Sequence, residues 1–368
     1  MAHGDHPRLT GAHHMNDDES VLLHTEGHTL HITLNRPRAL NALTHTMVRS
    51  IDEALTQAEA DASVVAVVIS GAGERGLCAG GDIRSIYQDA RAGRRASVDF
   101  WRDEYLLNAR IARFPKPYVA LMDGIVMGGG VGVSAHGDVR VVTERSRVAM
   151  PETGIGFVPD VGGTHLLGAA PGELGTHLAL TGRPVNAADA LACGLADHFV
   201  PSARLSDLVE ALSRCTAPAD VPETVRRYGG TAPAPELAEH RAWIDDCYAA
   251  DTVEEIIDRL AHTGLPAAEE TARSLRTLSP TSLKVTLEAV RRARRLGGLE
   301  AALDQEFRVS CRAFEGHDLV EGVRARIIDK DRAPKWNPAQ LGDVTEADVA
   351  RHFEPLGAGE LGLHAAAS

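Results

Sequence analysis

YVALMDGIVMGGG, residues 118–130, is the stretch that best indicates the fold. It begins as an apolar run of the kind found in a strand buried on both faces, and it ends in three glycines, Gly128, Gly129 and Gly130. An earlier run, VVAVVIS at residues 64–70, has the same character and also leads into glycine-rich turns. Buried strands of this kind, separated by helical segments, predict an α/β fold.

The segments around this stretch alternate between strand-like and helix-like patterns. Residues 29–36 alternate apolar and polar side chains as a half-buried strand does, and Thr44 can cap a helix that begins after it. A longer helix is expected over about residues 97–113, before the buried strand. We therefore expect an α/β core over residues 21–202.

The remainder of the chain divides by composition. Residues 1–20 are polar and are expected to form a flexible tail. Residues 203–278 place Pro- and Ala-rich stretches between short helical segments, which predicts a helical insertion. Residues 279–345 form a C-terminal region with two amphipathic helices, and residues 346–368, rich in Gly and Ala, are expected to be a weakly ordered tail. The N-terminal tail carries four histidines that are expected to be solvated rather than to bind a metal: His3, His6, His13 and His14.

Composition excludes several classes of protein. The 368 residues, 44% hydrophobic and 24% charged, are typical of a globular protein with one large domain or two ordinary ones. No apolar run is long enough to span a membrane, and the start lacks the apolar segment of a signal peptide, so we expect a cytoplasmic protein. The five cysteines are widely spaced and never form C-x-x-C, which indicates reduced thiols.

The net charge of −13 disfavours nucleic acid and anionic membranes as partners. Basic residues do cluster at Arg291, Arg292, Arg294 and Arg295. This cluster has two interpretations: it could bind the phosphates of a small anionic molecule, or it could be one solvated face of a helix.

Two glycine-rich turns follow strand-like runs, CAGGDI at 78–83 and MGGGVG at 127–132. Glycine leaves backbone N–H groups unshielded, so two such turns can supply the paired amides of an oxyanion hole, although each alone is more often a simple turn or packing point. The G-x-G-x-x-G at 71–76 is followed by another glycine-rich turn rather than a helix, so we do not expect a dinucleotide site.

Three acidic residues occupy apolar surroundings. Glu104 shares one face of its helix with Trp101, Asn108 and Ile111, which places it on the apolar side or at its rim. Glu152 and Asp160 lie eight positions apart in MPETGIGFVPDVGG, residues 150–163, which is otherwise apolar and rich in turn formers. Because burying an unpaired carboxylate is costly, this stretch is either a surface loop or a site that needs both acids.

These motifs together resemble a known family. CAGGDI, DGIVMGGG and PETGIGFVPDVGGT look like the crotonase (enoyl-CoA hydratase/isomerase) superfamily. Residues 306–336, EFRVSCRAFEGHDLVEGVRARIIDKDRAPKW, resemble the corresponding segment of its 3-hydroxyisobutyryl-CoA hydrolase branch. The resemblance covers residues 21–345. It implies a right-handed spiral of ββα units with a helical C-terminal region, which agrees with the α/β pattern.

The resemblance also assigns residues to an active site. It implies oxyanion-hole amides at Gly81 and Gly129 and a catalytic carboxylate at Glu152. Hydratases of the family carry a further catalytic glutamate where this chain has Gly132, and a reaction that adds water across a double bond uses two carboxylates. Hydratases also commonly have glycine at the position of Asp160, so both departures favour the hydrolase branch.

The implied reaction is hydrolysis of a short 3-hydroxyacyl-CoA thioester, with 3-hydroxyisobutyryl-CoA as the expected substrate. Catalytic roles fall on Glu152 and Asp160, while Glu104, Gly81 and Gly129 also line the substrate site. Glu152 either attacks the carbonyl carbon or activates a water molecule. We expect no metal and no cofactor beyond the CoA of the substrate, and a homo-oligomer (trimer, hexamer or dimer) is possible. The alternatives are an enoyl-CoA hydratase/isomerase and a noncatalytic acyl-CoA-binding protein.

Overall fold

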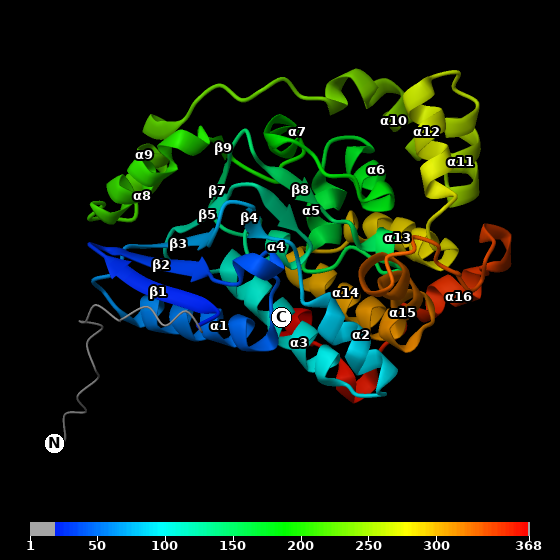
Figure 1. The fold of residues 1–368 in the computed structure, drawn as a ribbon, viewed down its shortest axis with the longest axis horizontal. Coiled ribbons are helices and arrows are strands. Elements are labelled where there is room, and N and C mark those ends of the chain that lie inside the picture. The colour runs from blue at the N-terminus through cyan, green and yellow to red at the C-terminus, as the bar shows by residue number, and fades with distance from the viewer. Residues whose placement is uncertain (1–18, 367–368) are drawn as a thin grey trace.

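The computed structural model describes residues 19–366. Within this range nine strands form two sheets (Figure 1). The six-stranded sheet has the order β1 (Val21–Glu26), β2 (Thr29–Leu34), β3 (Ala66–Gly71), β5 (Tyr118–Met122), β7 (Val139–Val142), β9 (His198–Phe199). The three-stranded sheet has the order β4 (Gly76–Cys78), β6 (Ile125–Met127), β8 (Arg147–Ala149). Only the β1–β2 pair is antiparallel.

A ββα unit is repeated along the core. The pairs β3–β4, β5–β6 and β7–β8 each place their first strand in the large sheet and their second in the small one. Helical segments follow each pair: α2 (Ile83–Arg91) and α3 (Ala96–Ala112); α4 (Gly129–Gly132); η2 (Glu152–Ile155) and α5 (Gly163–Ala169). This repeat confirms the predicted spiral of ββα units. Because β4, β6 and β8 are parallel, the three turns that follow them lie next to one another.

Helices cover both faces of the large sheet. On one side α1 (His45–Ala60) packs on β1 and β2 and on α3. It begins as predicted, with the Thr44 hydroxyl accepting a hydrogen bond from Met47 N. On the other side α8 (Leu205–Ser213) and α9 (Asp220–Tyr228) bury Leu208, Leu212 and Val225 against the strands.

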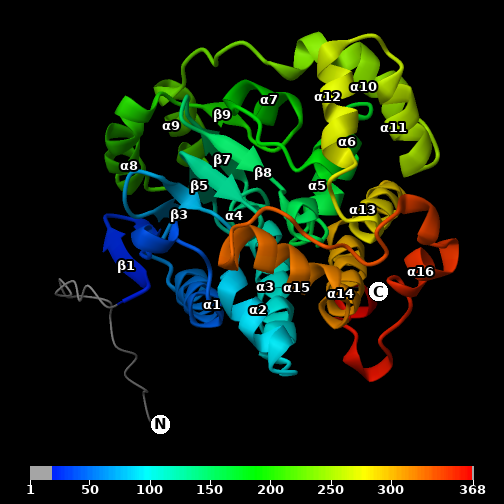
Figure 2. The same ribbon diagram turned by 45° about the vertical axis from the view of Figure 1, so that its right-hand side comes forward.

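The segment predicted as a helical insertion occupies two separate places. After α8 and α9 an extended link crosses the top of the molecule to a second group of helices (Figures 1 and 2). This group packs on α6 (Leu174–Thr181) and consists of η4 (Leu237–His240), α10 (Arg241–Tyr248), α11 (Val253–Ala261) and α12 (Pro266–Leu275). Short elements join α6 to α8: α7 (Ala187–Ala192) and η3 (Ser202–Arg204).

The C-terminal helices pack on the core units rather than extending from them. The two predicted amphipathic helices are α13 (Pro280–Ala293) and α14 (Leu299–Glu315), and α15 (Asp318–Val323) continues into a π-helical turn, η5 (Arg324–Ile328). α14 lies against α3 and α5. As a result, one face of α14 is buried directly beside the turns of the small sheet.

The prediction of a weakly ordered tail over residues 346–368 is wrong for its described part. Three short elements lie in it, α16 (Glu346–Arg351), η7 (Gly357–Gly359) and α17 (Leu363–Ala366), and η6 (Leu341–Asp343) precedes them. Phe353, Leu361 and Leu363 are buried, and the Asp304 carboxylate on α14 accepts the backbone amides of Leu363 and His364. A few buried apolar side chains and one carboxylate therefore hold this segment in place, although its Gly and Ala content predicts weak order.

Three further predictions concern the N-terminal tail, the cysteines and membrane-spanning helices. Residues 1–18, with the four tail histidines, lie outside the described residues. All five cysteines are free and buried, as expected for reduced thiols. No helix in residues 19–366 is long and apolar enough to cross a bilayer.

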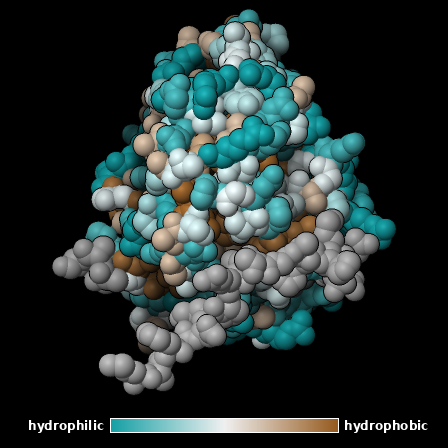
Figure 3. All heavy atoms as spheres, turned by 90° about the vertical axis from the view of Figure 1, so that its left-hand side faces the viewer, coloured by the Kyte–Doolittle hydropathy of each residue, from teal (hydrophilic) through white to brown (hydrophobic). Residues whose placement is uncertain are grey.

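The face that carries β1, α8 and α9 presents mostly hydrophilic residues, with hydrophobic ones visible between them (Figure 3).

Candidate active site

The first turn of the site leaves the amide of Gly81 without a partner. Leu43 N donates to Gly80 O and Asp82 N donates to Leu43 O, both at 2.8 Å, so the neighbours of Gly81 are hydrogen-bonded on both sides. The Gly81 N–H itself donates to no acceptor among the described residues. Gly80 adopts a φ of +114°, which only glycine adopts readily, and this allows the turn.

The second turn supplies another free amide beside the first. Gly129 is the first residue of α4, so its N–H has no acceptor within the helix. A side chain on Gly129 would begin 3.4 Å from Gly81 N and only 2.6 Å from Glu104 Oε1. A side chain on Gly129 would therefore crowd the Glu104 carboxylate, and the two amides and this carboxylate border the same small space.

Glu104 is held in this space by α3. It is 1% exposed, and Trp101, Asn108 and Ile111 on the same face are also buried. The interpretation of Glu104 as a rim acid is therefore wrong. Its Oε1 has no hydrogen-bond partner within the described residues. Burial, and then the charge of Asp160, raise the pKa of Glu104 well above its usual range.

Glu152 reaches the site from the turn after β8. It is the first residue of η2 and is 7% exposed, so the surface-loop alternative for residues 150–163 is wrong. Its Oε1 lies 2.8 Å from the point where a side chain on Gly128 would begin, and its Oε2 has no partner among the described residues. Burial and the nearby charge of Asp160 raise the pKa of Glu152 well above its usual range.

Asp160 completes the group of acids. It is 5% exposed, and its Oδ2 accepts a hydrogen bond of 2.7 Å from Tyr105 Oη. Tyr105 Oη lies 2.7 Å from Ser310 Oγ on α14 as well. Burial raises the pKa of Asp160 to about 7, although the hydrogen bond from Tyr105 lowers it. All five residues predicted for the site, the two glycines and the three acids, are thus brought together.

Gly132 is enclosed by its neighbours. A side chain at this position would begin 2.8 Å from Val161 Cβ and 2.9 Å from Asn108 Nδ2. An added carboxylate would have to displace Val161, which is itself 1% exposed. The absence of an acid at residue 132 is therefore built into the packing around it.

Sequence reasoning missed the polar residues that α14 contributes. Glu306 is 1% exposed, and its carboxylate accepts hydrogen bonds from Gly162 N at 2.6 Å, Thr164 N at 2.8 Å and the Thr164 hydroxyl. Burial raises its pKa to about 8. The signal was available, because Leu299, Leu303, Glu306 and Ser310 recur at helical spacing on the buried face.

The predicted basic cluster is used within the fold. Arg291 donates to the backbone oxygens of Ala250 and Asp251, and Arg292 and Arg294 pair with Glu288 and Glu173. The contacts of Arg291 and Arg294 tie α13 to its neighbours, whereas the Arg292–Glu288 pair lies within α13 itself. Three of the four arginines therefore have structural partners, which favours the solvated-helix interpretation over a phosphate site.

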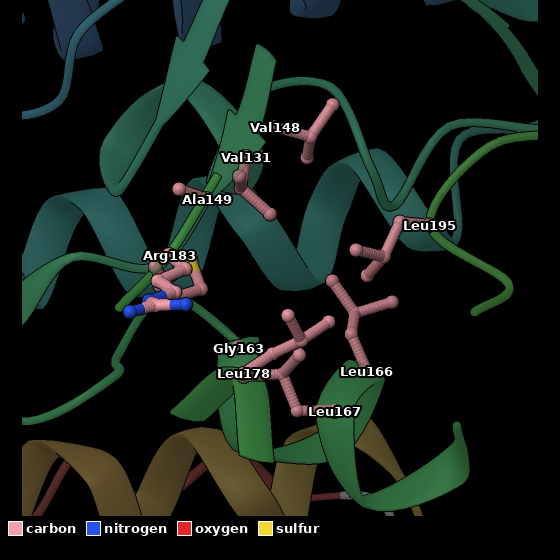
Figure 4. Close-up of a pocket in the computed structure, with 10 residues that line it drawn as sticks. Val131, Val148, Ala149, Gly163, Leu166, Leu167, Leu178, Arg183 and Leu195 are labelled. Carbon is pink, nitrogen blue, oxygen red and sulfur yellow. The ribbon is translucent and has the colours of Figure 1, made fainter. Parts of the chain in front are cut away.

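A small cavity lies behind the site and carries no acid. Val131, Leu166, Leu167 and Leu178 point into it, and Arg183 lies at one side (Figure 4). Its volume is about 10 Å³, which is no larger than one water molecule needs. The cavity is therefore a gap in the packing. No group of three or more His, Cys, Asp or Glu residues in residues 19–366 is placed to hold a metal ion.

Residues 29–353 match the enoyl-CoA hydratase/isomerase family. The chain is 44% identical over 348 residues to the mitochondrial 3-hydroxyisobutyryl-CoA hydrolase of Rattus norvegicus, covering 93% of this chain and 90% of that protein. It is 43% identical over 355 residues to the enzyme of that name from Homo sapiens, covering 95% and 92%.

Two solved structures are also similar. A carnitinyl-CoA dehydratase from Mycobacterium thermoresistibile superposes with a TM-score of 0.89 at 53% identity, covering 94% of this chain and 98% of that one. An enoyl-CoA hydratase from Rhodobacter sphaeroides 2.4.1 gives a TM-score of 0.87 at 44% identity, covering 93% and 99%. The fold, the motifs and these relatives agree: the chain belongs to the enoyl-CoA hydratase/isomerase, or crotonase, family.

Proposed function

We propose that this chain hydrolyses short 3-hydroxyacyl-CoA thioesters, with 3-hydroxyisobutyryl-CoA as the substrate and 3-hydroxyisobutyrate and CoA as the products. The observation that carries the proposal is the arrangement of three buried carboxylates beside two free amides, with no acid at residue 132. The relatives named 3-hydroxyisobutyryl-CoA hydrolase, which match nearly the whole chain, support the same reaction.

The thioester carbonyl oxygen binds between the N–H groups of Gly81 and Gly129. Negative charge develops on this oxygen as the carbonyl carbon becomes tetrahedral, and the two free amides stabilise that charge. Each well-placed donor is worth roughly 3 kcal/mol in such a site. Because the surroundings are buried, the interaction is stronger than it would be in water.

Glu152 carries out the attack on the carbonyl carbon in one of two ways. Its carboxylate forms a mixed anhydride that water then cleaves, or it takes a proton from the water molecule that attacks directly. Either route breaks the C–S bond, adds the elements of water and releases CoA as the thiol. The unpartnered Oε2 of Glu152 supports both routes, since it is free to bond to carbon or to accept a proton.

Asp160 and Glu104 assist this step. A carboxyl with a pKa of about 7, as in Asp160, is ionised in a large share of molecules near neutral pH, and the ionised form suits accepting a hydrogen bond from the attacking water or the substrate hydroxyl. Glu104 lines the opposite side of the space next to Gly129 and is suited to hold the 3-hydroxyl group. The proposed reaction uses no metal and no cofactor beyond the CoA of the substrate.

A hydratase or isomerase is the second candidate. The solved relatives named as a dehydratase and a hydratase favour it. The packing around Gly132 argues against it, because the second carboxylate that hydration uses has no room there. A noncatalytic acyl-CoA-binding protein is the third candidate, but a binding scaffold has no need of three buried acids beside a thioester.

The test is release of CoA thiol from 3-hydroxyisobutyryl-CoA, followed with a disulfide dye. We expect turnover by the purified chain, and Glu152→Gln should lower kcat by at least about 10³-fold while leaving the melting temperature intact or higher. Binding of the thioester without CoA release would favour the noncatalytic candidate. A series that includes 3-hydroxypropionyl-CoA would define the acyl group.

Location and assembly stay predictions from the sequence. The cytoplasmic location stays a prediction, and the vertebrate relatives carry the word mitochondrial in their names. A trimer, a hexamer or a dimer would each be compatible with the proposed reaction. Light scattering of the purified chain would distinguish them.

A further inference from the structure

A strained turn follows Asp160. Gly163 N donates to Asp160 O at 2.6 Å, and the two residues between them have positive φ angles, 52° at Val161 and 81° at Gly162. These features define a type I′ β-turn, whose first central position normally holds Gly, Asn or Asp. A β-branched valine is unfavourable in this left-handed region and stays there only if its surroundings hold it.

Two side chains hold the turn: Glu306, which is buried, and His136, which is half-buried. His136 Nε2 lies 2.7 Å from Val161 O, and burial lowers the pKa of His136 to about 4, so the neutral ring donates this hydrogen bond. On the other side Glu306 accepts the amides of Gly162 and Thr164. These contacts satisfy the Val161 C=O and the Gly162 N–H, which are the two polar ends of the central peptide group of the turn.

Glu306 stands out because a buried carboxylate is costly and has no cation beside it. Within the described residues, every hydrogen bond to its two oxygens comes from Gly162 or Thr164. One helical turn further along α14, Ser310 contacts Tyr105, which donates to the Asp160 carboxylate. One face of α14 therefore fixes both the backbone after Asp160 and its side chain.

The turn also shapes the opposite wall of the site. Val161 projects to the place where a side chain on Gly132 would begin, 2.8 Å away. The strained turn that directs Asp160 into the site thus also places Val161 in the space that a carboxylate side chain at residue 132 would need. A relaxed turn would move both features together.

We propose that Glu306 is a positioning residue, which keeps Asp160 in its reactive place by holding the strained turn at Val161 and Gly162. This inference rests on the proposed hydrolase function for its kinetic test, but the contact itself can be tested without turnover. His136 supports the same turn from the other side.

The kinetic test compares two carboxylates on α14. Glu306→Gln places an amide N–H against one of the backbone donors, whereas Asp304→Asn makes the same kind of change at a residue that holds the amides of Leu363 and His364, away from the site. We expect Glu306→Gln to lower kcat by about 10- to 100-fold with KM within about threefold, since small displacements of reacting groups have effects of this size. Asp304→Asn should lower the melting temperature but keep kcat within about twofold.

The second part of the kinetic test relieves the backbone strain at residue 161. Glycine adopts the φ of 52° at residue 161 without cost, so Val161→Gly should let the turn form without Glu306. We expect Val161→Gly in the Glu306→Gln background to recover kcat at least about fivefold. If the double variant is no faster than Glu306→Gln, or if Asp304→Asn loses as much kcat, Glu306 is only structural and the proposal is wrong.

Hydrogen exchange tests the contact independently of activity. Backbone amides over residues 157–166 should exchange faster in Glu306→Gln and keep the wild-type rate in Asp304→Asn. Should Glu306→Gln fail to fold, Thr164→Val removes only the hydroxyl donor, and we expect kcat to fall about threefold with faster exchange of the same segment. Unchanged exchange in these variants would overturn the proposal, whereas an inert wild type with the expected exchange would reject the hydrolase function alone.

Discussion

The two halves of the site are built in different ways. The amide half consists of Gly81 and Gly129, which belong to short turns after β4 and β6 and are set by hydrogen bonds to close neighbours. The acid half draws Glu104, Glu152 and Asp160 from separate elements, and α14 holds it from a distance of about 150 residues in the chain. Polarising the substrate therefore depends on local backbone geometry, whereas the proton chemistry depends on packing between remote helices.

The amide half should be the more sensitive to a single methyl group. Gly129→Ala places a carbon 2.6 Å from Glu104 Oε1 and 3.1 Å from Leu43 Cδ1, so the Glu104 carboxylate must move away from the amides and the methyl group takes its place beside them. We expect kcat for CoA release to fall by about 10²-fold, since a displacement of about 1 Å within a site has an effect of this size.

Gly154→Ala is the matched control for this change. Gly154 lies in η2 next to Glu152, but an added methyl group there meets no atom within 4 Å. Its kcat should stay within about twofold of wild type. Equal losses in the two variants would show that any added methyl group near the site is harmful and would remove the special role of Gly129.

The contribution of Asp160, in the acid half, should be measurable in the pH dependence of kcat. Tyr105 donates to Asp160, and this hydrogen bond lowers the pKa of the carboxyl. Tyr105→Phe removes the donor, so the pKa of Asp160 rises above about 7 and the acidic limb of the pH–rate profile moves to higher pH. At pH 8 the loss of rate should be no more than about tenfold. A limb that moves to lower pH would contradict the assignment.

The smallest expected effect is on stability, and it has the opposite sign to the effect on rate. Burial raises the pKa of Asp160 from about 4 in the unfolded chain to about 7 in the fold, so the folded state binds the proton more tightly. The wild type therefore loses stability as the pH rises through this interval, and Asp160→Asn does not.

Thermal melts at two pH values check this sign. At pH 8 the Asp160→Asn variant should melt about 2–4 °C above the wild type, and at pH 4 the difference should vanish. A variant that melts lower at pH 8 would mean that the ionised carboxylate stabilises the fold, and the burial argument for Asp160 would be wrong.

The same division explains what the sequence alone could predict. The glycine-rich turns with Gly81 and Gly129, and the helix face with Glu104, follow from patterns within a few residues, whereas the roles of these three residues follow from the resemblance to the family. Glu306 has the same helical spacing, which indicates that it is buried, but its partners, Gly162 and Thr164, lie more than 140 residues away in the chain, so its role does not follow from that spacing. No local pattern predicts which strand–helix unit a distant helix will pack against.

The C-terminal residues show the same limit in the fold. The composition of residues 346–366 predicts weak order, but Asp304 and a few buried side chains, which only folding brings near them, hold these residues in place. The β-branched residue in the type I′ turn is a further case. Val161 looks like an ordinary apolar residue in the sequence, and its positive φ is held by the hydrogen bond from His136 to Val161 O and by the hydrogen bond from Gly162 N to Glu306.

The most direct test of the central claim is a side-by-side assay of the wild-type chain with 3-hydroxyisobutyryl-CoA and with crotonyl-CoA, measuring CoA thiol release from the first and loss of the conjugated double bond in the second. The packing at Gly132 and the buried acids at Glu152 and Asp160 predict thiol release with a kcat/KM at least about 100-fold above that for hydration. Rapid hydration of crotonyl-CoA without thiol release from 3-hydroxyisobutyryl-CoA would contradict the account.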